Sequence, residues 1–427
     1  MTLVVTLLAA LGFFALVMAS IALHELGHLV PAKLFGVKVT QYFVGFGRTL
    51  WRTRRGETDY GIKMLPLGGY VRMVGMYSPG RPGRPDSRLN RLADEARAVE
   101  FDEVGPGDEG RLFHQRPTWQ RVVVMASGPL MNLLLAFVIL AGVNALHGQY
   151  RPQLVAAAVS ECAVPASRAA QGCTDADSVA PAKKAGVRVG DRIVSFNGQR
   201  PEDWPALSGM IRANKGQAAR LVVERDGRLV TLPMVHTIVT ALPSRMDPAR
   251  TEQAGFLGVT PTTELVQVGL GGTAQDLWRQ AERSTRALLR FPVSVWNVAT
   301  DLVTGRDREA NGPVSIVGAS RAAGEVVGNH ALERNDRIAS WFMMLSSVNL
   351  FVFLLNCVPL PPLDGGHIAA ALVETVRRLV ARALGRPDPG PVDTARLLPV
   401  AYLVGGFLTL AGAVLVVADI ISPVQIF

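Results

Sequence analysis

The sequence has 427 residues, enough for several modules, and its balance of residue types is unusual for a soluble enzyme of this size. Hydrophobic residues make up 49% of the chain, charged residues only 19%, and the formal net charge is +9. This balance favours a membrane protein. The positive charge does not indicate nucleic-acid binding, because Lys and Arg gather beside apolar segments, as the positive-inside rule expects.

Four uncharged apolar stretches are each long enough to cross a bilayer, which takes about 20 helical residues. They cover residues 1–23, 122–146, 338–363 and 397–418. The first could instead be a cleaved signal peptide, but it has no basic segment before it and leads directly into the motif described below. We expect transmembrane helices over residues 1–35, 119–147, 336–366 and 396–420.

The distribution of basic residues predicts how these helices are oriented. Lys and Arg gather in residues 33–121 and again in residues 377–396, and both segments should therefore face the cytoplasm. The N-terminus, residues 148–337 and the C-terminus would then be extracytoplasmic. We expect a multi-pass protein of the cytoplasmic (inner) membrane.

Residues 36–77, after the first span, predict membrane-associated β-strands. Residues 41–50 and 60–76 within them mix Gly with aromatic and β-branched residues, which is typical of short strands and turns. Residues 78–118 contain Pro, Gly, Arg and Asp without periodicity. We expect them to form a cytoplasmic loop.

Residues 150–262 predict a compact extracytoplasmic domain. A strand is expected over residues 193–196, and an Asp-Gly pair between the apolar runs 221–224 and 229–232 is a strong hairpin signal. Residues 255–260 would supply a closing strand.

Two of the three cysteines, Cys162 and Cys173, lie in this predicted outside segment. In an oxidising compartment they could close a small disulfide loop, and the alternative is two unpaired thiols. Cys357 lies in the third apolar stretch and is expected to be a small apolar filler.

Residues 263–335 form an amphipathic and linking region. Apolar side chains recur at three- to four-residue steps over residues 274–304, with Pro292 interrupting the run. The pattern fits a helix that lies on the membrane surface, and equally an ordinary helix packed on its own domain.

The motif that carries chemistry is His24-Glu25-Leu26-Gly27-His28, an H-E-x-x-H pattern. On a helix the two histidines lie one turn apart on one face, where they can hold one zinc ion. Glu25 would be the general base for a zinc-bound water. Ionisable residues at the end of an apolar span are costly, so they usually mark function.

A catalytic zinc needs a third protein ligand and an open position for water. The third apolar stretch ends in NCVPLPPLDGG at residues 356–366, where Asp364 is the first charge after a long uncharged run. The prolines must break regular helix, and irregular backbone at membrane depth is tolerated only when it is buried in protein or lines a cavity. This pattern indicates an aspartate delivered into a protein-lined pocket.

HELGH on the first span, together with N-x-x-P-x-P-x-L-D-G-G on a later one, resembles the site-2 protease family of intramembrane zinc metalloproteases. The regulator-of-sigma-E-protease branch is the most similar. Residues 68–71, 113–121 and 128–132 agree with the family, and residues 182–198 resemble a PDZ domain. The resemblance implies a polytopic α-helical membrane protein of about four transmembrane helices, with membrane-associated β-strands and an extracytoplasmic PDZ-like α/β domain.

The resemblance also implies roles for individual residues. His24, His28 and Asp364 would bind Zn²⁺, and Glu25 would be the catalytic base. An extended substrate would be held by Asn356, Pro359 and Pro361, and Asn132 on the second span is a further candidate for a polar contact.

Members of this family cut single-span transmembrane proteins in the lipid bilayer after an upstream site-1 protease has trimmed them. Anti-sigma factors are typical substrates, and remnant signal peptides are another class. The PDZ-like domain would filter substrates by size or bind a newly exposed C-terminal carboxylate. Some members of the branch carry two PDZ domains, whereas one such signature is seen in this sequence.

Three classes of function therefore compete. The presence of all four chemical residues favours an active intramembrane zinc protease over a non-proteolytic scaffold that binds through its PDZ-like domain. A transporter or channel would predict internal repeats, and the sequence shows none. Four apolar spans exclude a soluble zinc protease.

Overall fold

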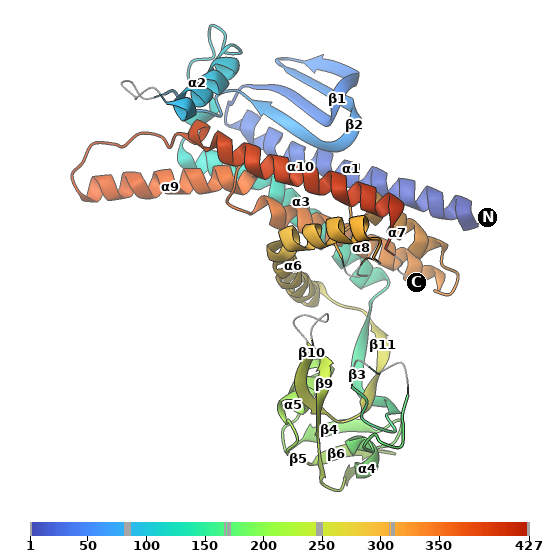
Figure 1. Cartoon of the computed structure of the whole chain (residues 1–427). Helices are drawn as coiled ribbons and strands as arrows, with labels where there is room; N and C mark the ends of the chain where they lie inside the picture. The colour runs from blue at the N-terminus through green and yellow to red at the C-terminus, as the bar shows by residue number, and fades with distance from the viewer. Residues whose placement is uncertain are drawn as a thin grey trace. The chain divides into compact units, whose positions relative to one another are not determined.

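The computed structural model divides the chain into two compact units, which are described separately (Figure 1). The membrane unit consists of Met1–Ala145 and Gly269–Phe427, and the β-rich unit of Leu146–Val268. The structure describes residues 2–80, 87–165, 168, 172–244, 251–306, 308 and 312–424.

Among these described residues, four helices are long and apolar enough to cross a membrane, in agreement with the four apolar stretches. They are α1 (Thr2–Leu34), α3 (Thr118–Leu146), α8 (Arg334–Asn356) and α10 (Leu398–Ile421). Much of their surface is apolar and exposed, as at Leu7, Leu134 and Leu403. Such a surface suits a lipid environment. The chain is accordingly a multi-pass membrane protein.

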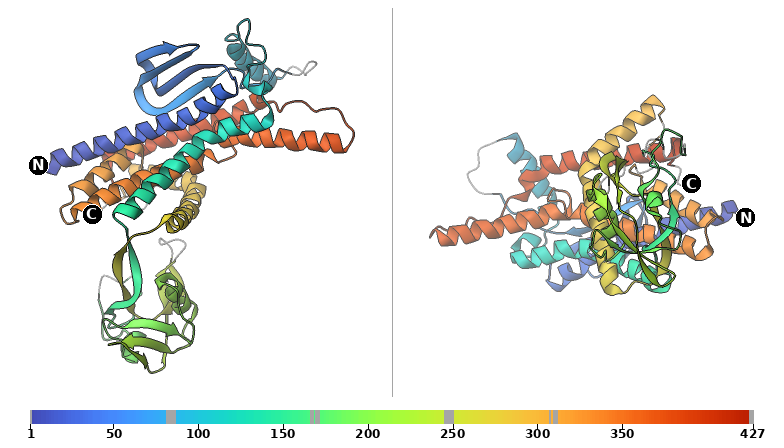
Figure 2. Two further views of the ribbon diagram at one scale, coloured as in Figure 1. Left: turned by 180° about the vertical axis from the view of Figure 1, so that it is seen from behind. Right: turned by 90° about the horizontal axis from the view of Figure 1, so that it is seen from below.

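Further helices pack against these four (Figure 2). Apolar clusters join α6 (Leu270–Thr304) to α3, α8 and α10, and α7 (Ile316–Gly328) to α1 and α8. Helix α6 includes the expected residues 274–304 and continues through Pro292. The Pro292 side chain is exposed, so the backbone hydrogen bond that it removes lies on the outer face, where a helix tolerates the loss.

Helix α6 buries Leu277 and Val298 against neighbouring helices and exposes Trp278 and Trp296 on another face. Its packing on the membrane unit is therefore established. Its contact with a membrane surface stays a prediction.

The segment after α1 forms one sheet of two long, bent antiparallel strands, β1 (Val39–Arg55) and β2 (Thr58–Met73). The register shows that residues 41–44 pair with both residues 59–62 and residues 69–72. Gly45, at a φ of 93°, turns the chain between the two halves of β1. Within the described residues, the last part of β2 pairs on one side only and forms an edge of this sheet.

The segment expected to be a cytoplasmic loop contains helix α2 (Arg88–Phe101) and the short helix η1 (Phe113–Gln115). The hydroxyl of Ser87 caps α2 by accepting a hydrogen bond from the Asn90 N–H. Ala93 is buried against Ala395 and Leu398, so a contact distant in sequence stabilises this helix. Helices α9 (Asp364–Ala383) and η3 (Thr394–Leu397) complete the membrane unit.

The β-rich unit is built on a five-stranded sheet in the order β11-β3-β4-β6-β7, with two-stranded pairs β9–β10 and β5–β8. Its elements are β3 (Gln149–Val159), α4 (Pro181–Ala185), β4 (Arg192–Phe196), α5 (Trp204–Ala213), β5 (Ala218–Ala219), β6 (Leu221–Arg225), β7 (Arg228–Thr231), β8 (Val235–His236), β9 (Ile238–Pro243), β10 (Thr251–Phe256) and β11 (Val259–Val266). A single apolar core that includes Ile193, Leu207 and Leu221 holds the unit together.

In this unit the structure confirms the expected hairpin, decides between the two alternatives for the cysteines, and moves the start of the closing strand. Strands β6 and β7 form the expected hairpin, with positive φ at both Asp226 and Gly227. Cys162 and Cys173 form a disulfide bond. The closing strand is β11 and begins only at residue 259, because Gly258 adopts a φ of 89° and turns the chain so that Leu257 enters the core.

Candidate active site in the membrane unit

Helix α1 carries His24, Glu25 and His28 close to its C-terminal end. The two histidines are buried and one helical turn apart, and their Nε2 atoms lie 3.3 Å from each other. Both imidazole rings therefore converge on one point beside the helix, as the four-residue spacing of the histidines predicts.

Asp364 reaches the same point from the first residue of α9. Its Oδ2 lies 3.4 Å from His24 Nε2 and 3.3 Å from His28 Nε2. The next two residues pack closely against the irregular segment that precedes α9. A Cβ at Gly365 would lie 2.4 Å from the Val358 carbonyl oxygen, and a Cβ at Gly366 would lie 2.5 Å from the Pro361 nitrogen. Only glycine fits at these two positions, and this close packing places Asp364.

The geometry of these three side chains fits a zinc ion. Two ligands that are each about 2.0–2.1 Å from a tetrahedral zinc lie about 3.3–3.4 Å apart, which is the spacing observed for every pair. Asp364 Oδ2 is buried and has no hydrogen-bond partner among the described residues. A buried carboxylate oxygen is costly without a partner, and a cation between the three atoms would supply one.

Both histidines are held in the tautomer that a metal ligand needs. His24 Nδ1–H donates to Asn132 Oδ1 at 2.6 Å, and His28 Nδ1–H donates to the Val124 carbonyl at 2.8 Å. Because both acceptors lie on α3, this helix directs the Nε2 lone pairs of both rings toward Asp364.

A chain of buried polar side chains continues behind Asn132. Its Nδ2 donates to Asn349 Oδ1 on α8 at 3.0 Å, and Asn349 Nδ2 donates to Ser20 Oγ on α1 at 3.2 Å. Sequence analysis did not single out Asn349 or Ser20, although polar residues inside apolar spans are a usable signal. The structure places Asn132 behind His24, fully buried, with both ends of its amide occupied.

Glycines allow α1, α3 and the β1–β2 sheet to meet at this site. A Cβ at Gly128 would lie 2.1 Å from His28 Nε2, and one at Gly27 would lie 2.6 Å from the Ser127 carbonyl. On the sheet, a Cβ at Gly69 would lie 2.8 Å from Glu25 Cγ. The glycines of the second span and of the sheet are therefore needed for close approach to the histidines and to the glutamate.

The three convergent side chains open into a cavity of about 390 Å³. Glu25 and residues 68–71 of the β2 edge line it on one side, and Asn356 at the end of α8 lines it as well. Pro359 and Pro361 lie in the turn between α8 and α9, behind Asp364, and are not among the lining residues. The cavity thus brings Glu25, the three convergent side chains and an open strand edge together.

Two histidines and a glutamate on α1, which is long and apolar enough to span a membrane, meet a carboxylate from the start of α9, and this arrangement is typical of a membrane-embedded metallohydrolase. Comparison with known proteins narrows this class. Residues 12–384 match the model of Peptidase family M50. The chain belongs to this family, the site-2 proteases, and is a zinc metalloprotease.

Several curated relatives align over almost the whole chain. Zinc metalloprotease Rip1 of Mycobacterium tuberculosis is 33% identical over 433 residues, which cover 97% of this chain and 98% of the relative. Zinc metalloprotease Rip1 of Mycolicibacterium smegmatis is 30% identical over 97% of this chain and 98% of the relative. Metalloprotease MmpA of Caulobacter vibrioides is 28% identical over 85% of each chain. Family membership implies membrane-embedded substrates and a lipid bilayer as the working environment.

Proposed function

We propose that this protein cuts single-span membrane proteins, such as anti-sigma factors, within the bilayer after a site-1 protease has trimmed them. One observation carries the proposal: His24, His28 and Asp364 converge at zinc-ligand spacing on a cavity that an open strand edge borders, among helices able to span a membrane. A metalloprotease site in such helices suits a substrate that is itself embedded in lipid.

His24, His28 and Asp364 would hold the zinc ion, which when bound lowers the pKa of water toward neutrality and polarises a carbonyl. Glu25 follows His24 directly and lines the same cavity, so it is placed to accept a proton from the attacking water. The same carboxyl then donates that proton to the nitrogen of the departing peptide. Asn132 and the Val124 carbonyl keep both imidazole rings oriented throughout.

A peptide bond within a helix is closed to attack, so the substrate must unwind into an extended strand. The edge of β2 at residues 69–73 borders the cavity and could pair with such a strand through main-chain hydrogen bonds. Asn356 offers an amide side chain on the same cavity. Pro359 and Pro361 would act by shaping the turn that presents Asp364 and Asn356 to the substrate.

The disulfide supports placing the β-rich unit outside the cytoplasm, because such bonds persist in oxidising compartments. The protein would lie in the inner membrane, with its N- and C-termini on the same extracytoplasmic side.

We propose that the β-rich unit is the PDZ-like domain and filters substrates by size. Deletion of residues 165–240 should then allow cleavage of untrimmed substrates. If deletion instead abolishes cleavage of trimmed ones, carboxylate binding becomes the better account.

The decisive experiment compares the purified protein with its Glu25→Gln variant in detergent and in liposomes. Both proteins should bind one zinc ion, and only the wild type should cut a trimmed single-span substrate, at a bond within or near its membrane span. A wild type that binds zinc yet cuts nothing across a panel of trimmed substrates would favour the scaffold. Equal cleavage by the variant would remove Glu25 from the mechanism.

A further inference from the structure

Helix α9 carries a second carboxylate on its buried side, at Glu374. This residue is 1% exposed and lies ten residues, or about 15 Å, beyond Asp364 on the same helix. Nothing in the chemistry described above uses it. A fully buried carboxylate requires ionic or hydrogen-bonding partners, because an unpaired buried charge is strongly destabilising.

The partners of Glu374 come from three segments. Arg121 Nη2 at the start of α3 donates to Glu374 Oε1 at 2.5 Å, and the Val392 N–H donates to Oε2 at 3.2 Å. Arg378, one turn along α9, lies 3.1 Å from Oε1 but is one-third exposed. Of the two arginines, only Arg121 connects α9 to a different helix, the candidate membrane span α3.

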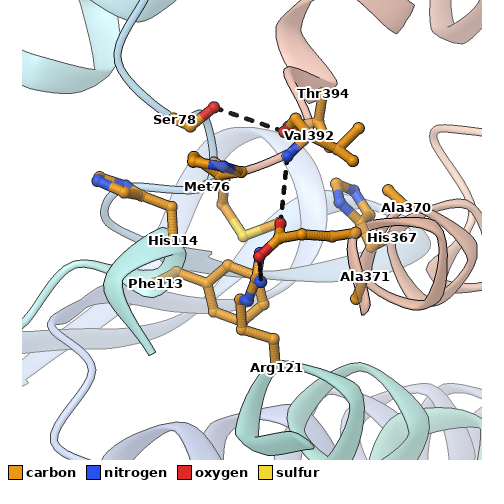
Figure 3. Close-up of a pocket in the computed structure, with 12 residues that line it drawn as sticks. Met76, Ser78, Phe113, His114, Arg121, His367, Ala370, Ala371, Val392 and Thr394 are labelled. Atoms are coloured by element: carbon orange, nitrogen blue, oxygen red, sulfur yellow. Dashed lines mark hydrogen bonds and ion pairs between the residues drawn. The ribbon is translucent and has the colours of Figure 1, made fainter. Parts of the chain in front are cut away.

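Arg121 and Glu374 meet at a small polar cavity of about 20 Å³, room for about one water molecule. Figure 3 shows Arg121 reaching from α3 into this pocket, with His367 and Ala371 of α9 to its right. His367 lines both this pocket and the cavity of the active site. The pocket of the ion pair therefore shares the wall residue His367 with the cavity of the active site.

The two helices joined by this ion pair are the ones that position the metal ligands. After Arg121, the same helix supplies the Val124 carbonyl for His28, Gly128 for close approach, and Asn132 for His24. Helix α9 begins with Asp364. The pair consequently links the helix that orients both histidines with the helix that presents the carboxylate.

The start of α9 is held by the close packing of Gly365 and Gly366 against the turn before it. The preceding residues form an irregular turn, and Leu363 at the N-cap makes no side-chain capping hydrogen bond. A buried ion pair adds little net stability compared with apolar packing, whereas it does specify one arrangement of the groups that it joins. The ion pair adds a second fixed point about 15 Å along the helix, and two such points define the rotation of α9 about its axis.

We propose that the Arg121–Glu374 ion pair is a positioning clamp that fixes the rotation of α9 and so keeps Asp364 in line with His24 and His28. Neither residue touches the substrate or the metal, so both are positioning residues. The inference rests on the ligand set given under the proposed function.

The test uses the full-length protein in detergent with the variants Glu374→Gln and Arg121→Lys. Zinc affinity is measured by competition with a chelator, and the visible absorption of the Co²⁺-substituted protein reports the geometry of the ligands. We expect Glu374→Gln to weaken zinc binding about 10- to 100-fold and to change the Co²⁺ spectrum. Arg121→Lys keeps the charge but loses the planar guanidinium, and should give a smaller change in the same direction.

Two controls separate the clamp from loss of charge and from loss of stability. Arg378→Gln removes the exposed partner of Glu374 and should change zinc affinity less than 3-fold. Asp419→Asn breaks the buried pair of Asp419 with Arg308 in the same unit, far along the chain from the ligands. It should lower the melting temperature while leaving zinc affinity and the Co²⁺ spectrum unchanged.

Wild-type zinc affinity and an unchanged Co²⁺ spectrum in Glu374→Gln would overturn the clamp, as would an equal loss of zinc affinity in Asp419→Asn. If Glu374→Gln cannot be purified folded, Arg121→Lys decides by the same two measurements. Asp364→Asn distinguishes failure of the clamp from failure of the proposed ligand set. If that variant binds zinc as tightly as the wild type, the proposed ligand set fails and not merely the clamp.

Discussion

The two units of this protein differ in the side chains that they expose and in how they use buried polar ones. The β-rich unit is held together by an apolar core in which Ile193, Leu207 and Leu221 are fully buried. The membrane unit exposes many large apolar side chains and buries polar ones in pairs between helices, such as Asn132 with Asn349 and Arg121 with Glu374.

The difference follows from the surroundings of each unit. In water, apolar burial supplies most of the stability of a domain, so its core can consist of aliphatic and aromatic side chains alone. In lipid the exterior is already apolar, and polar side chains are tolerated only where they face one another inside the bundle. Substitutions in the β-rich core should therefore change stability, whereas substitutions of buried polar or glycine residues in the membrane unit should change the site.

The largest effect is expected from Gly128→Ala. The added Cβ would lie 2.1–2.7 Å from three ring atoms of His28, so the ring must leave its position and the ligand set breaks. Zinc content and proteolysis should both be lost in the purified protein. Gly142→Ala on the same helix meets no atom within 4 Å and serves as the control. A Gly128→Ala variant that keeps its zinc would contradict this account of the helix crossing.

Leu221→Ala in the β-rich unit should lower the free energy of unfolding by about 2–5 kcal/mol, because it opens a cavity in a fully packed core. Chemical denaturation of residues 146–268, expressed alone because their core is self-contained, measures this change. Leu229→Ala is the matched control, since the Leu229 side chain is 68% exposed. In the full-length protein, Leu221→Ala should leave the zinc content unchanged. A loss of zinc in this variant would contradict the expectation that core substitutions in the β-rich unit change only stability.

Asn132→Ala should weaken zinc binding about 10- to 100-fold, or about 1.4–2.7 kcal/mol, because His24 loses the acceptor that holds its tautomer. Asn144 is the control: it is also buried on α3, and its Nδ2 donates to Thr273 Oγ1 at 2.8 Å. Asn144→Ala removes a comparable hydrogen bond away from the ligands. If both variants lose zinc equally, Asn132 is a structural residue and not an orienting one.

The smallest effect concerns pH and the β-rich unit. Nε and Nη2 of Arg225 donate hydrogen bonds to the Asp191 carboxylate at 2.8 Å and 2.7 Å. This ion pair lowers the pKa of Asp191 below its ordinary value, although burial of the carboxyl acts in the opposite direction. Because the folded pKa is lowered, this stabilisation is complete above the unfolded pKa of about 3.9 and disappears as the pH falls through the folded value.

The excised β-rich unit should therefore be more stable than its Asp191→Asn variant at pH 7, and the difference should shrink below about pH 4. Denaturation at a series of pH values measures it. Glu202→Gln, at an exposed carboxylate, is the control. A difference in stability that stays constant from pH 7 to pH 2 would show that the ion pair is not its source.

Short-range patterns in the sequence predicted much of what the structure shows. The spacing of His24 and His28 determines that both lie on one face of a helix, and apolar length predicts the four spans. The Asp-Gly hairpin follows from the dihedral angles that only a few residues adopt readily. Where the local pattern was weak, as in residues 88–101, no helix was predicted, and α2 forms there through contacts distant in sequence.

The sequence by itself thus determined the chemistry of this protein, because the histidines and their glutamate are neighbours on one helix and Asp364 stands out after a long uncharged run. Only the tertiary structure decided how that chemistry is held in place. The contacts of Asn132, Gly128 and Glu374 join residues from different helices. Such pairs depend on which faces of the helices meet, and no local spacing records that choice.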